Sequence, residues 1–137
     1  MFLQFEGIRI VCINAFLFRR GAAVTIPGVG IITGKSGACD INLLRHEFGH
    51  ILQFRQQGAC FYWCYIAPAS LLSAIKAHRH YAYRHMSCWT EWSANLLSYR
   101  YFNEPESWDH LNFPVRNSYV LSGKQSFRVN AFINSIT

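Results

Sequence analysis

The sequence has no pair of cysteines spaced Cys-x-x-Cys, although five cysteines occur among its 137 residues. A zinc knuckle or ribbon is therefore not supported, because such sites bind their metal through cysteine pairs of this kind. The chain also begins without a basic segment, and Arg9 interrupts the apolar run that a signal peptide needs. With an odd number of cysteines and no leader pattern, we expect a reducing, cytoplasmic location.

Acidic residues are scarce, since seven Asp and Glu stand against 13 Lys and Arg and give a net charge of +6 at pH 7. The basic residues are scattered, and they cluster only at Arg19-Arg20 and within residues 78–85. Such a distribution gives weak attraction to anionic surfaces. Because no recognisable nucleic-acid-binding module accompanies it, we expect no nucleic acid as a partner, and membrane contact only at the periphery.

No internal repeat or low-complexity tract occurs, and the hydrophobic fraction of 51% argues against a disordered chain. At this length the chain is expected to form a single domain, residues 1–137. Residues 8–13, 22–26 and 29–33 read as strands, with a turn at Pro27-Gly28. Because helical patterns follow, we predict an α+β fold in which a small N-terminal sheet precedes the helices.

The most informative segment reads His46-Glu47-Phe48-Gly49-His50. On an α-helix, His46 and His50 lie one turn apart on nearly the same side. Two imidazole nitrogens can then meet one Zn²⁺ at about 2.0–2.1 Å. Glu47 lies roughly 100° further round the helix, which keeps its carboxylate off the metal but near a water molecule on it. Two ligands and a base are the working half of a zinc hydrolase.

The flanking sequence favours a helix at this position, with Asp40 as its N-cap and Gly58 as its C-cap. Between them an apolar stripe at helical spacing comprises Ile41, Leu44, Phe48, Ile51 and Leu52. His46 and His50 lie well round from this stripe, whereas a histidine that only packs in the core would lie within it. We therefore predict a metal-binding helix.

A catalytic zinc ion takes three protein ligands and keeps one position for water. The best candidate for the third ligand is Glu91, which lies 91 − 50 = 41 positions beyond His50. Residues 88–102 contain no Gly or Pro and are compatible with a helix. On that helix Asn95 lies one turn beyond Glu91, where its side chain can accept the free ring N–H of a ligand histidine.

Other candidates for the third ligand rank below Glu91. Cys88 lies three residues before it, and a thiolate with two histidines is sound zinc chemistry. Three histidines rank lower, because their basic and aromatic stretch is typical of a solvated loop or the wall of a site: His78, His80 and His85. Asp109 and His110 lie between turn-prone residues and rank last.

His46-Glu47-x-x-His50, followed by Glu91-x-x-x-Asn95, resembles the gluzincin metallopeptidases. In that family the second helix carries a glutamate ligand, and an acidic or amide residue four positions later supports a ligand histidine. The resemblance covers about residues 40–102. It implies His46, His50 and Glu91 as ligands and Glu47 as general base, with Asn95 in place of the more familiar aspartate. Three runs are also similar to small uncharacterised proteins common in Bacteroidetes: residues 45–53, 67–74 and 89–95.

Residues 58–75 contain no charged residue over 18 positions. That length is at the lower limit for a membrane span. A single span would leave His50 and Glu91 on opposite sides of the bilayer, and Pro68 with two serines also disfavours one. We therefore expect a buried or interfacial helix that covers the metal-binding helix.

Together these features predict a zinc-dependent hydrolase with a zincin-like core, in which a hydrophobic helix separates the two ligand helices and a loop-and-strand tail closes the chain. The expected substrate is a peptide or protein, and the developing oxyanion needs a donor, for which Tyr81, Tyr83 and His85 are candidates by position. Two alternatives remain open. One is a zinc-stabilised binding or scaffold domain without turnover, and the other is a membrane-associated protein anchored through residues 58–75.

Overall fold

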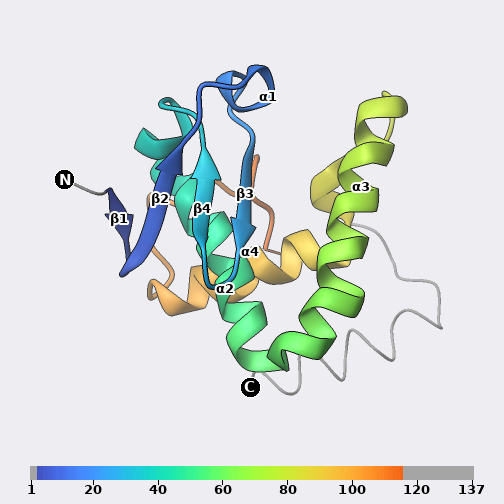
Figure 1. Cartoon of the computed structure of the whole chain (residues 1–137). Helices are drawn as coiled ribbons and strands as arrows, with labels where there is room; N and C mark the ends of the chain where they lie inside the picture. The colour runs from blue at the N-terminus through green and yellow to red at the C-terminus, as the bar shows by residue number, and fades with distance from the viewer. Residues whose placement is uncertain (1–2, 116–137) are drawn as a thin grey trace.

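The fold begins with a small sheet from the first quarter of the chain. The computed structural model describes residues 3–115, and Figure 1 shows this sheet beside a set of helices. Its strands are β1 (Gln4–Phe5), β2 (Ile8–Cys12), β3 (Ala23–Ile26) and β4 (Gly30–Thr33), in the spatial order β1-β2-β4-β3. β2 and β4 run parallel, whereas β1–β2 and β3–β4 are antiparallel. The predicted α+β class and its three N-terminal strands are confirmed.

The hairpin between β3 and β4 turns where Pro27 and Gly28 predicted it, and the Val29 N–H donates to the Ile26 carbonyl at 2.9 Å. Gly30 then has φ +141°, and a Cβ there would meet a backbone oxygen of β2 at 2.3 Å, so the parallel pairing needs a glycine. The sequence did not predict β1 or the short helix α1 (Phe16–Arg19), because neither is long enough to show a hydrophobic period.

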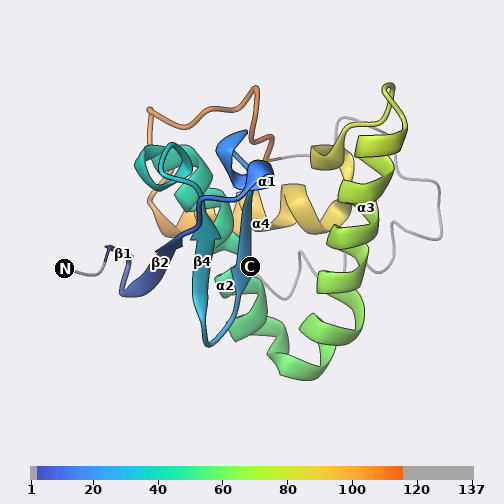
Figure 2. The ribbon, with the colours of Figure 1, turned by 45° about the horizontal axis from the view of Figure 1, so that its top comes forward.

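The helices follow in the predicted order. After a 3-10 turn (Gly37–Cys39) come α2 (Ile41–Phe61), a π-helical turn (Tyr62–Ile66), α3 (Ala67–Arg79), a second 3-10 turn (His85–Ser87) and α4 (Trp89–Tyr101). Figure 2 shows α2 and α3 joined as a helical hairpin, with α4 crossing close to both. α2 leads the chain away from the sheet, and α3 leads it back. α4 can therefore cross the middle of α2.

α2 begins as predicted, because the Asp40 carboxylate accepts hydrogen bonds from the N–H groups of Asn42 and Leu43 at 3.0 and 3.1 Å. Its path breaks at Gly58, where φ is 81° and ψ is 162°. A glycine adopts this backbone at little cost, unlike other residues. The helix resumes directly after it, so Gly58 marks a kink and not the predicted end of the helix.

α2 is buried on two faces. On one face Leu44 packs with Ile10 and Ile31 of the sheet, as the apolar stripe predicted, although Ile41 at the start of that stripe is exposed. On the other face α2 meets α4 so closely that a Cβ on Gly49 would lie 2.2 Å from the Ala94 carbonyl oxygen. A glycine at this crossing therefore allows polar groups of α2 and α4 to meet.

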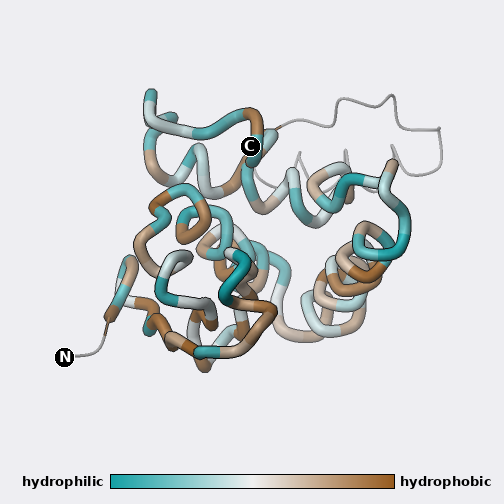
Figure 3. The backbone as a smooth tube through the Cα atoms, turned by 90° about the horizontal axis from the view of Figure 1, so that it is seen from above, coloured by the Kyte–Doolittle hydropathy of each residue, from teal (hydrophilic) through white to brown (hydrophobic). Residues whose placement is uncertain are grey.

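The hydrophobic helix is largely exposed, so the expectation of a buried helix over α2 is wrong, whereas the alternative of an interfacial helix stays a prediction. Within residues 58–75 only Tyr62, Ile66 and Ser73 are buried. The continuous helix Ile41–Arg79 contains an 18-residue window that is long and apolar enough to cross a membrane. Only 17% of that window is buried, whereas the core helix of a soluble protein is mostly buried. Figure 3 shows apolar residues along α3 at the margin of the molecule. The sheet and α4 already occupy the two buried faces of α2, which leaves no face for α3 to cover.

The segment after α4 packs back on the start of α2. Leu43 forms a buried cluster with Trp108 and Phe113, and the Trp108 indole N–H donates to the Phe113 carbonyl at 2.8 Å. The described part of the predicted tail, residues 102–115, consists of turns without a strand. The rest of that tail, residues 116–137, lies outside the described residues.

Candidate metal centre

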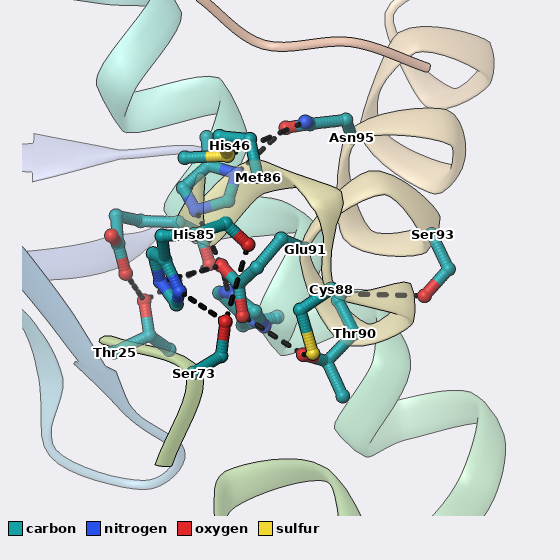
Figure 4. A network of polar contacts seen from close by, with 12 residues as sticks. Thr25, His46, Ser73, His85, Met86, Cys88, Thr90, Glu91, Ser93 and Asn95 are labelled. Carbon is teal, nitrogen blue, oxygen red and sulfur yellow. Dashed lines mark hydrogen bonds and ion pairs between the residues drawn. The ribbon is translucent and has the colours of Figure 1, made fainter. Parts of the chain in front are cut away.

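Two helices bring three potential metal ligands together where α2 crosses α4. His46 and His50 project from α2 and Glu91 from α4, and their ligand atoms all lie within 4.8 Å of one another. The three residues are buried, with exposed fractions of 3%, 6% and 1%. Figure 4 shows the His46 ring and the Glu91 carboxylate turned toward one another. Within residues 3–115 this is the one such group, and it can hold a metal ion.

The Glu91 carboxylate is arranged to bind a cation. Its Oε1 accepts a hydrogen bond from the Thr90 hydroxyl at 2.9 Å. Its Oε2 lies 3.4 Å from Nε2 of both His46 and His50, and accepts no well-oriented hydrogen bond from the described residues. A buried oxygen without a donor is costly, and a cation between these atoms would satisfy it. The 3.4 Å separations fit, since ligands about 2.0–2.2 Å from a tetrahedral zinc lie about 3.3 Å apart.

The other ring nitrogen of each histidine meets an amide oxygen. Nδ1 of His46 lies 2.6 Å from Asn95 Oδ1, and Nδ1 of His50 lies 2.8 Å from Gln53 Oε1. Because an amide oxygen can only accept, each Nδ1 carries a hydrogen, and Nε2 is left to bind a metal. Asn95 donates through Nδ2 to the Pro114 carbonyl at 2.9 Å, which turns its oxygen toward the ring. Asn95 therefore makes the contact with His46 that was expected of it, and its support of a metal ligand stays a prediction.

Gln53 plays the same part for His50, and sequence reasoning missed it. Its Nε2 donates to the Thr90 carbonyl at 2.7 Å and to the Ser93 hydroxyl at 2.9 Å, and its exposed fraction is 0%. Two acceptors on α4 therefore fix the amide so that its oxygen faces the ring. The signal available in the sequence was the spacing of three residues from His50, which places both side chains on one face of α2.

The two charged groups of the cluster stabilise each other. Burial by itself lowers the pKa of His50, but the charge of Glu91 and polar contact with it outweigh this and raise the pKa from 6.5 to about 9. Burial by itself raises the pKa of Glu91, whereas the charge of His50 and contacts with the neighbouring rings hold it well below its usual value. A bound cation would take the place of the His50 proton.

Glu47 lies beside the cluster and is not a member of it. It is buried, and its Oε2 accepts a hydrogen bond of 2.7 Å from the Thr25 hydroxyl on β3. The same hydroxyl lies 3.0 Å from the Glu47 carbonyl oxygen, so β3 holds both the side chain and the backbone. The charge of Glu47 raises the pKa of His50 and of Tyr62, which places the carboxylate within electrostatic reach of the site.

A third histidine approaches Glu91 from the segment between α3 and α4. His85 Nε2 lies 3.2 Å from Glu91 Oε2, and His85 Nδ1 lies 2.9 Å from the Ser73 hydroxyl. That hydroxyl is also 2.9 Å from the Tyr83 hydroxyl, whereas Tyr81 is fully exposed. The His85 side chain is 29% exposed and stands outside the ligand cluster, so it lies at the open edge of the site (Figure 4).

Tyr62 is a further group that sequence reasoning missed. Burial raises the pKa of its hydroxyl, and the charges of Glu47 and Glu91 raise it further. Its ring packs edge-on against Phe54, with centroids 5.5 Å apart. A protonated hydroxyl therefore lies within electrostatic reach of both carboxylates. It was overlooked because it falls within the uncharged run 58–75 and reads there as an apolar residue.

The remaining candidates for the third ligand lie apart from the cluster. The Cys88 thiol contacts the α3 backbone and a threonine of α4, and all five cysteines are free. His78 and His80 are exposed. The Asp109 carboxylate accepts hydrogen bonds within its own turn, and the His110 ring packs against an aromatic ring of α4. Among the described residues the geometry selects Glu91.

Comparison of the chain with protein families, with curated proteins and with solved structures gave no match. The chemistry of the site is therefore inferred from its own geometry. Three features carry that inference: the buried ligand cluster, the fixed carboxylate of Glu47 and the histidine at the open edge.

Proposed function

We propose that this protein is a zinc-dependent hydrolase that cleaves a peptide bond in a peptide or protein substrate. The observation that carries the proposal is the cluster of His46, His50 and Glu91, in which two Nε2 atoms face one carboxylate oxygen. Two imidazoles and one carboxylate form a ligand set of catalytic zinc sites, which keep one coordination position open for water. The amide partners of both rings support the same interpretation, because they fix the tautomer that a metal requires.

Zinc fits this donor set better than the other common divalent ions. Calcium and magnesium prefer six or more oxygen ligands, whereas the cluster offers two nitrogens and one carboxylate. Zinc accepts nitrogen and oxygen donors in a four-coordinate geometry without a strict preference for either. The order of sheet, helix with two histidines and helix with a glutamate also supports a zincin-like core.

Glu47 has the position and the freedom from metal binding that a general base needs. A zinc ion held by His46, His50 and Glu91 would supply a water molecule with a pKa of about 7 and would polarise the substrate carbonyl. Glu47, held by the Thr25 hydroxyl, would be the base that takes up the proton of the attacking water and gives it to the leaving amine. Its hydrogen bond to β3 keeps the carboxylate in place through both transfers.

The oxyanion that develops on the substrate needs a donor beside the metal. His85 is the best-placed group, because its Nε2 faces the cluster at the open edge while Ser73 holds the opposite ring nitrogen. Tyr62 is the second candidate, because burial and the charges of Glu47 and Glu91 raise the pKa of its hydroxyl, which therefore keeps its proton. Of the three donors predicted by position, His85 reaches the cluster, whereas Tyr83 contacts Ser73, which in turn contacts His85.

A zinc-stabilised scaffold without turnover is the alternative, and Glu47 separates the two functions. A purely structural zinc site fills its four positions with protein ligands and needs no buried carboxylate beside them. The burial of Glu47 costs desolvation energy, and a structural zinc site gains nothing in return for it. The buried carboxylate therefore favours the hydrolase over the scaffold.

The test is a peptide library at neutral pH with the zinc-loaded protein and its Glu47→Gln variant. The variant keeps the size and the zinc but loses the base, so turnover should fall about 10²–10⁴-fold. Glu106→Gln is the matched control, because Glu106 is an exposed carboxylate remote in sequence from the motif, and it should keep full activity. Equal turnover in parent and Glu47→Gln, or no turnover in a zinc-loaded parent, would overturn the proposal.

A further inference from the structure

The end of α2, the π-helical turn and α3 expose large apolar side chains over three consecutive segments. We define this outer face by its large side chains, which are Phe61, Trp63, Tyr65, Leu71, Leu72 and Ile75. Their exposed fractions run from 37% for Phe61 to 65% for Leu72. The rings of Phe61 and Tyr65 stack with centroids 5.1 Å apart, so the aromatic part of this face is preformed. Soluble monomers rarely leave so many large apolar residues together in water.

The charges around the outer face have one sign. Residues 48–90 contain no Asp or Glu, and residues 58–75 contain no charge at all. Beyond Ile75 the helix ends in Lys76 and Arg79, and Arg84 follows in the next loop. The Lys76 ammonium lies 4.3 Å from the centre of the Tyr83 ring, which holds this cation near the C-terminal end of α3.

We propose that the outer face docks on the surface of an anionic lipid bilayer, with α3 lying in the plane of the interface. Trp and Tyr favour the boundary between headgroups and acyl chains, and leucines of an in-plane helix enter the acyl region. Lys and Arg at the end of such a helix reach the lipid phosphates. The structure supplies all three groups on one surface, and this inference does not depend on the proposed hydrolase activity.

The arrangement of the chain favours a peripheral contact over a span. Residues 51–61 lead away from the ligand cluster and α3 leads back toward it, so that Glu91 meets His46 and His50. The inner side of α3 is engaged through Ser73, which contacts both Tyr83 and His85. Only the outer face is therefore available to lipid, and the metal centre stays with the protein.

Charge also argues against two other occupants. A second copy packed on this face would offer no carboxylate from residues 48–90 to Lys76 and Arg79, so its charge does not complement theirs. The C-terminal residues 116–137 carry three basic residues and no acidic one, so their charge does not complement the face either. An anionic bilayer complements both its apolar surface and its cationic end.

Vesicle flotation with the full chain tests the proposal. We expect the protein to float with phosphatidylcholine vesicles that contain about 30% phosphatidylglycerol and to bind pure phosphatidylcholine vesicles more weakly. Arg79→Gln should weaken binding to the anionic vesicles about fivefold, the share of one cation near a charged surface. Leu72→Glu should weaken it more strongly, because it places a carboxylate in the centre of the outer face.

The matched control is Val29→Glu, which adds the same charge at an exposed apolar residue on the turn between β3 and β4. It should bind vesicles within about twofold of the parent, since one added charge at a distance is largely screened. Circular dichroism verifies that each variant is folded. Absence of binding to either kind of vesicle would overturn the proposal, and so would equal losses in Leu72→Glu and Val29→Glu. A concentration-dependent dimer that Leu72→Glu dissociates, without vesicle binding, would assign the face to a second copy and would also overturn it.

Discussion

α2 and α3 are consecutive helices that differ in which kind of side chain they bury and which they expose. α2 buries polar side chains, namely His46, Glu47, His50 and Gln53, whereas α3 and the turn before it expose large apolar ones. A helix that only has to be stable in water does the reverse, with apolar residues inside and polar residues outside. Buried polar groups and exposed apolar patches are the informative departures from that rule. Here they separate an interior that can hold a metal ion from an exterior that we propose faces lipid.

The two helices also differ in how their unusual surfaces are partnered. The side chains of His46, Glu47, His50 and Gln53 each have a hydrogen-bond partner on another element or on α2 itself, such as Asn95 for His46 and Thr25 for Glu47. Those contacts offset the cost of burial and give the cluster a single arrangement. The outer face of α3 has no such partner within the described residues. The polar side chains of α2 are therefore positioned by contacts within the described residues and leave Glu91 Oε2 without a donor, whereas the outer face of α3 has no apolar partner there.

The largest expected effect comes from removing a ligand. Purified protein should contain about one zinc per chain, and His46→Ala, His50→Ala or Glu91→Ala should reduce this to near zero. The loss follows because two remaining ligands cannot hold the ion against water. Elemental analysis after gel filtration measures it. Cys88→Ala is the control, since that thiol stands outside the cluster. Zinc retained by Glu91→Ala but lost from Cys88→Ala would identify a different third ligand.

The second effect concerns the crossing of α2 and α4. In Gly49→Ala the new Cβ would lie 2.2 Å from the Ala94 carbonyl oxygen, so the helices must move apart. Such overpacking should cost about 1–3 kcal/mol in the free energy of unfolding and weaken zinc binding as Glu91 recedes. Chemical denaturation and zinc titration measure both. Gln57→Ala, on the same helix away from the crossing, should lose neither. Unchanged zinc affinity in Gly49→Ala would mean that the crossing does not set the geometry of the ligands.

The third effect is that of the amide behind each ring. Asn95→Leu and Gln53→Met each remove the acceptor for one Nδ1–H, and each should weaken zinc binding about 10–100-fold. Asn95→Asp keeps an acceptor for His46 and should stay closer to the parent. Competition with a zinc chelator measures these affinities. If Asn95→Leu bound zinc like the parent, the ring orientation would be set by packing alone.

These amides also show what the sequence predicts and what it does not. His46, His50 and Glu91 were predictable because ligand types and helical spacing are local, and Asn95 followed from its spacing to Glu91. Gln53 was missed because its donors bind Thr90 and Ser93 on another helix, a contact that depends on the crossing at Gly49. Thr25 was missed for the same reason, since its link to Glu47 is tertiary.

The fold was predictable to a similar degree. The strands, the cap at Asp40 and the order of the helices follow from local patterns, and the break at Gly58 was correctly located. The exposure of α3 was not predictable, because an uncharged run reads equally as buried in protein or buried in lipid. Only the arrangement of the neighbouring elements shows that residues 3–115 leave the outer face uncovered.

The smallest expected effect is the number of protons released when zinc binds. Without metal, His50 has its pKa raised from 6.5 to about 9, so its stabilising ion pair is fully present below 6.5 and is lost as the pH rises through about 9. Because a metal binds neutral histidine, zinc binding at about pH 7.5 should release about one proton from this group. Calorimetry in buffers of different ionisation enthalpy measures the number. Release should fall toward zero above pH about 9.5. A release that does not change with pH would contradict the His50–Glu91 ion pair.

The most direct test of the metal centre is an anomalous difference map recorded at the zinc absorption edge on crystals of the full chain. We predict one strong peak bounded by Nε2 of His46, Nε2 of His50 and Oε2 of Glu91, at about 2.0–2.2 Å from each. The same peak should vanish just below the edge. A zinc-loaded crystal with no peak between these three atoms, or with its peak at Cys88 or at the histidines of residues 78–80, would contradict the account.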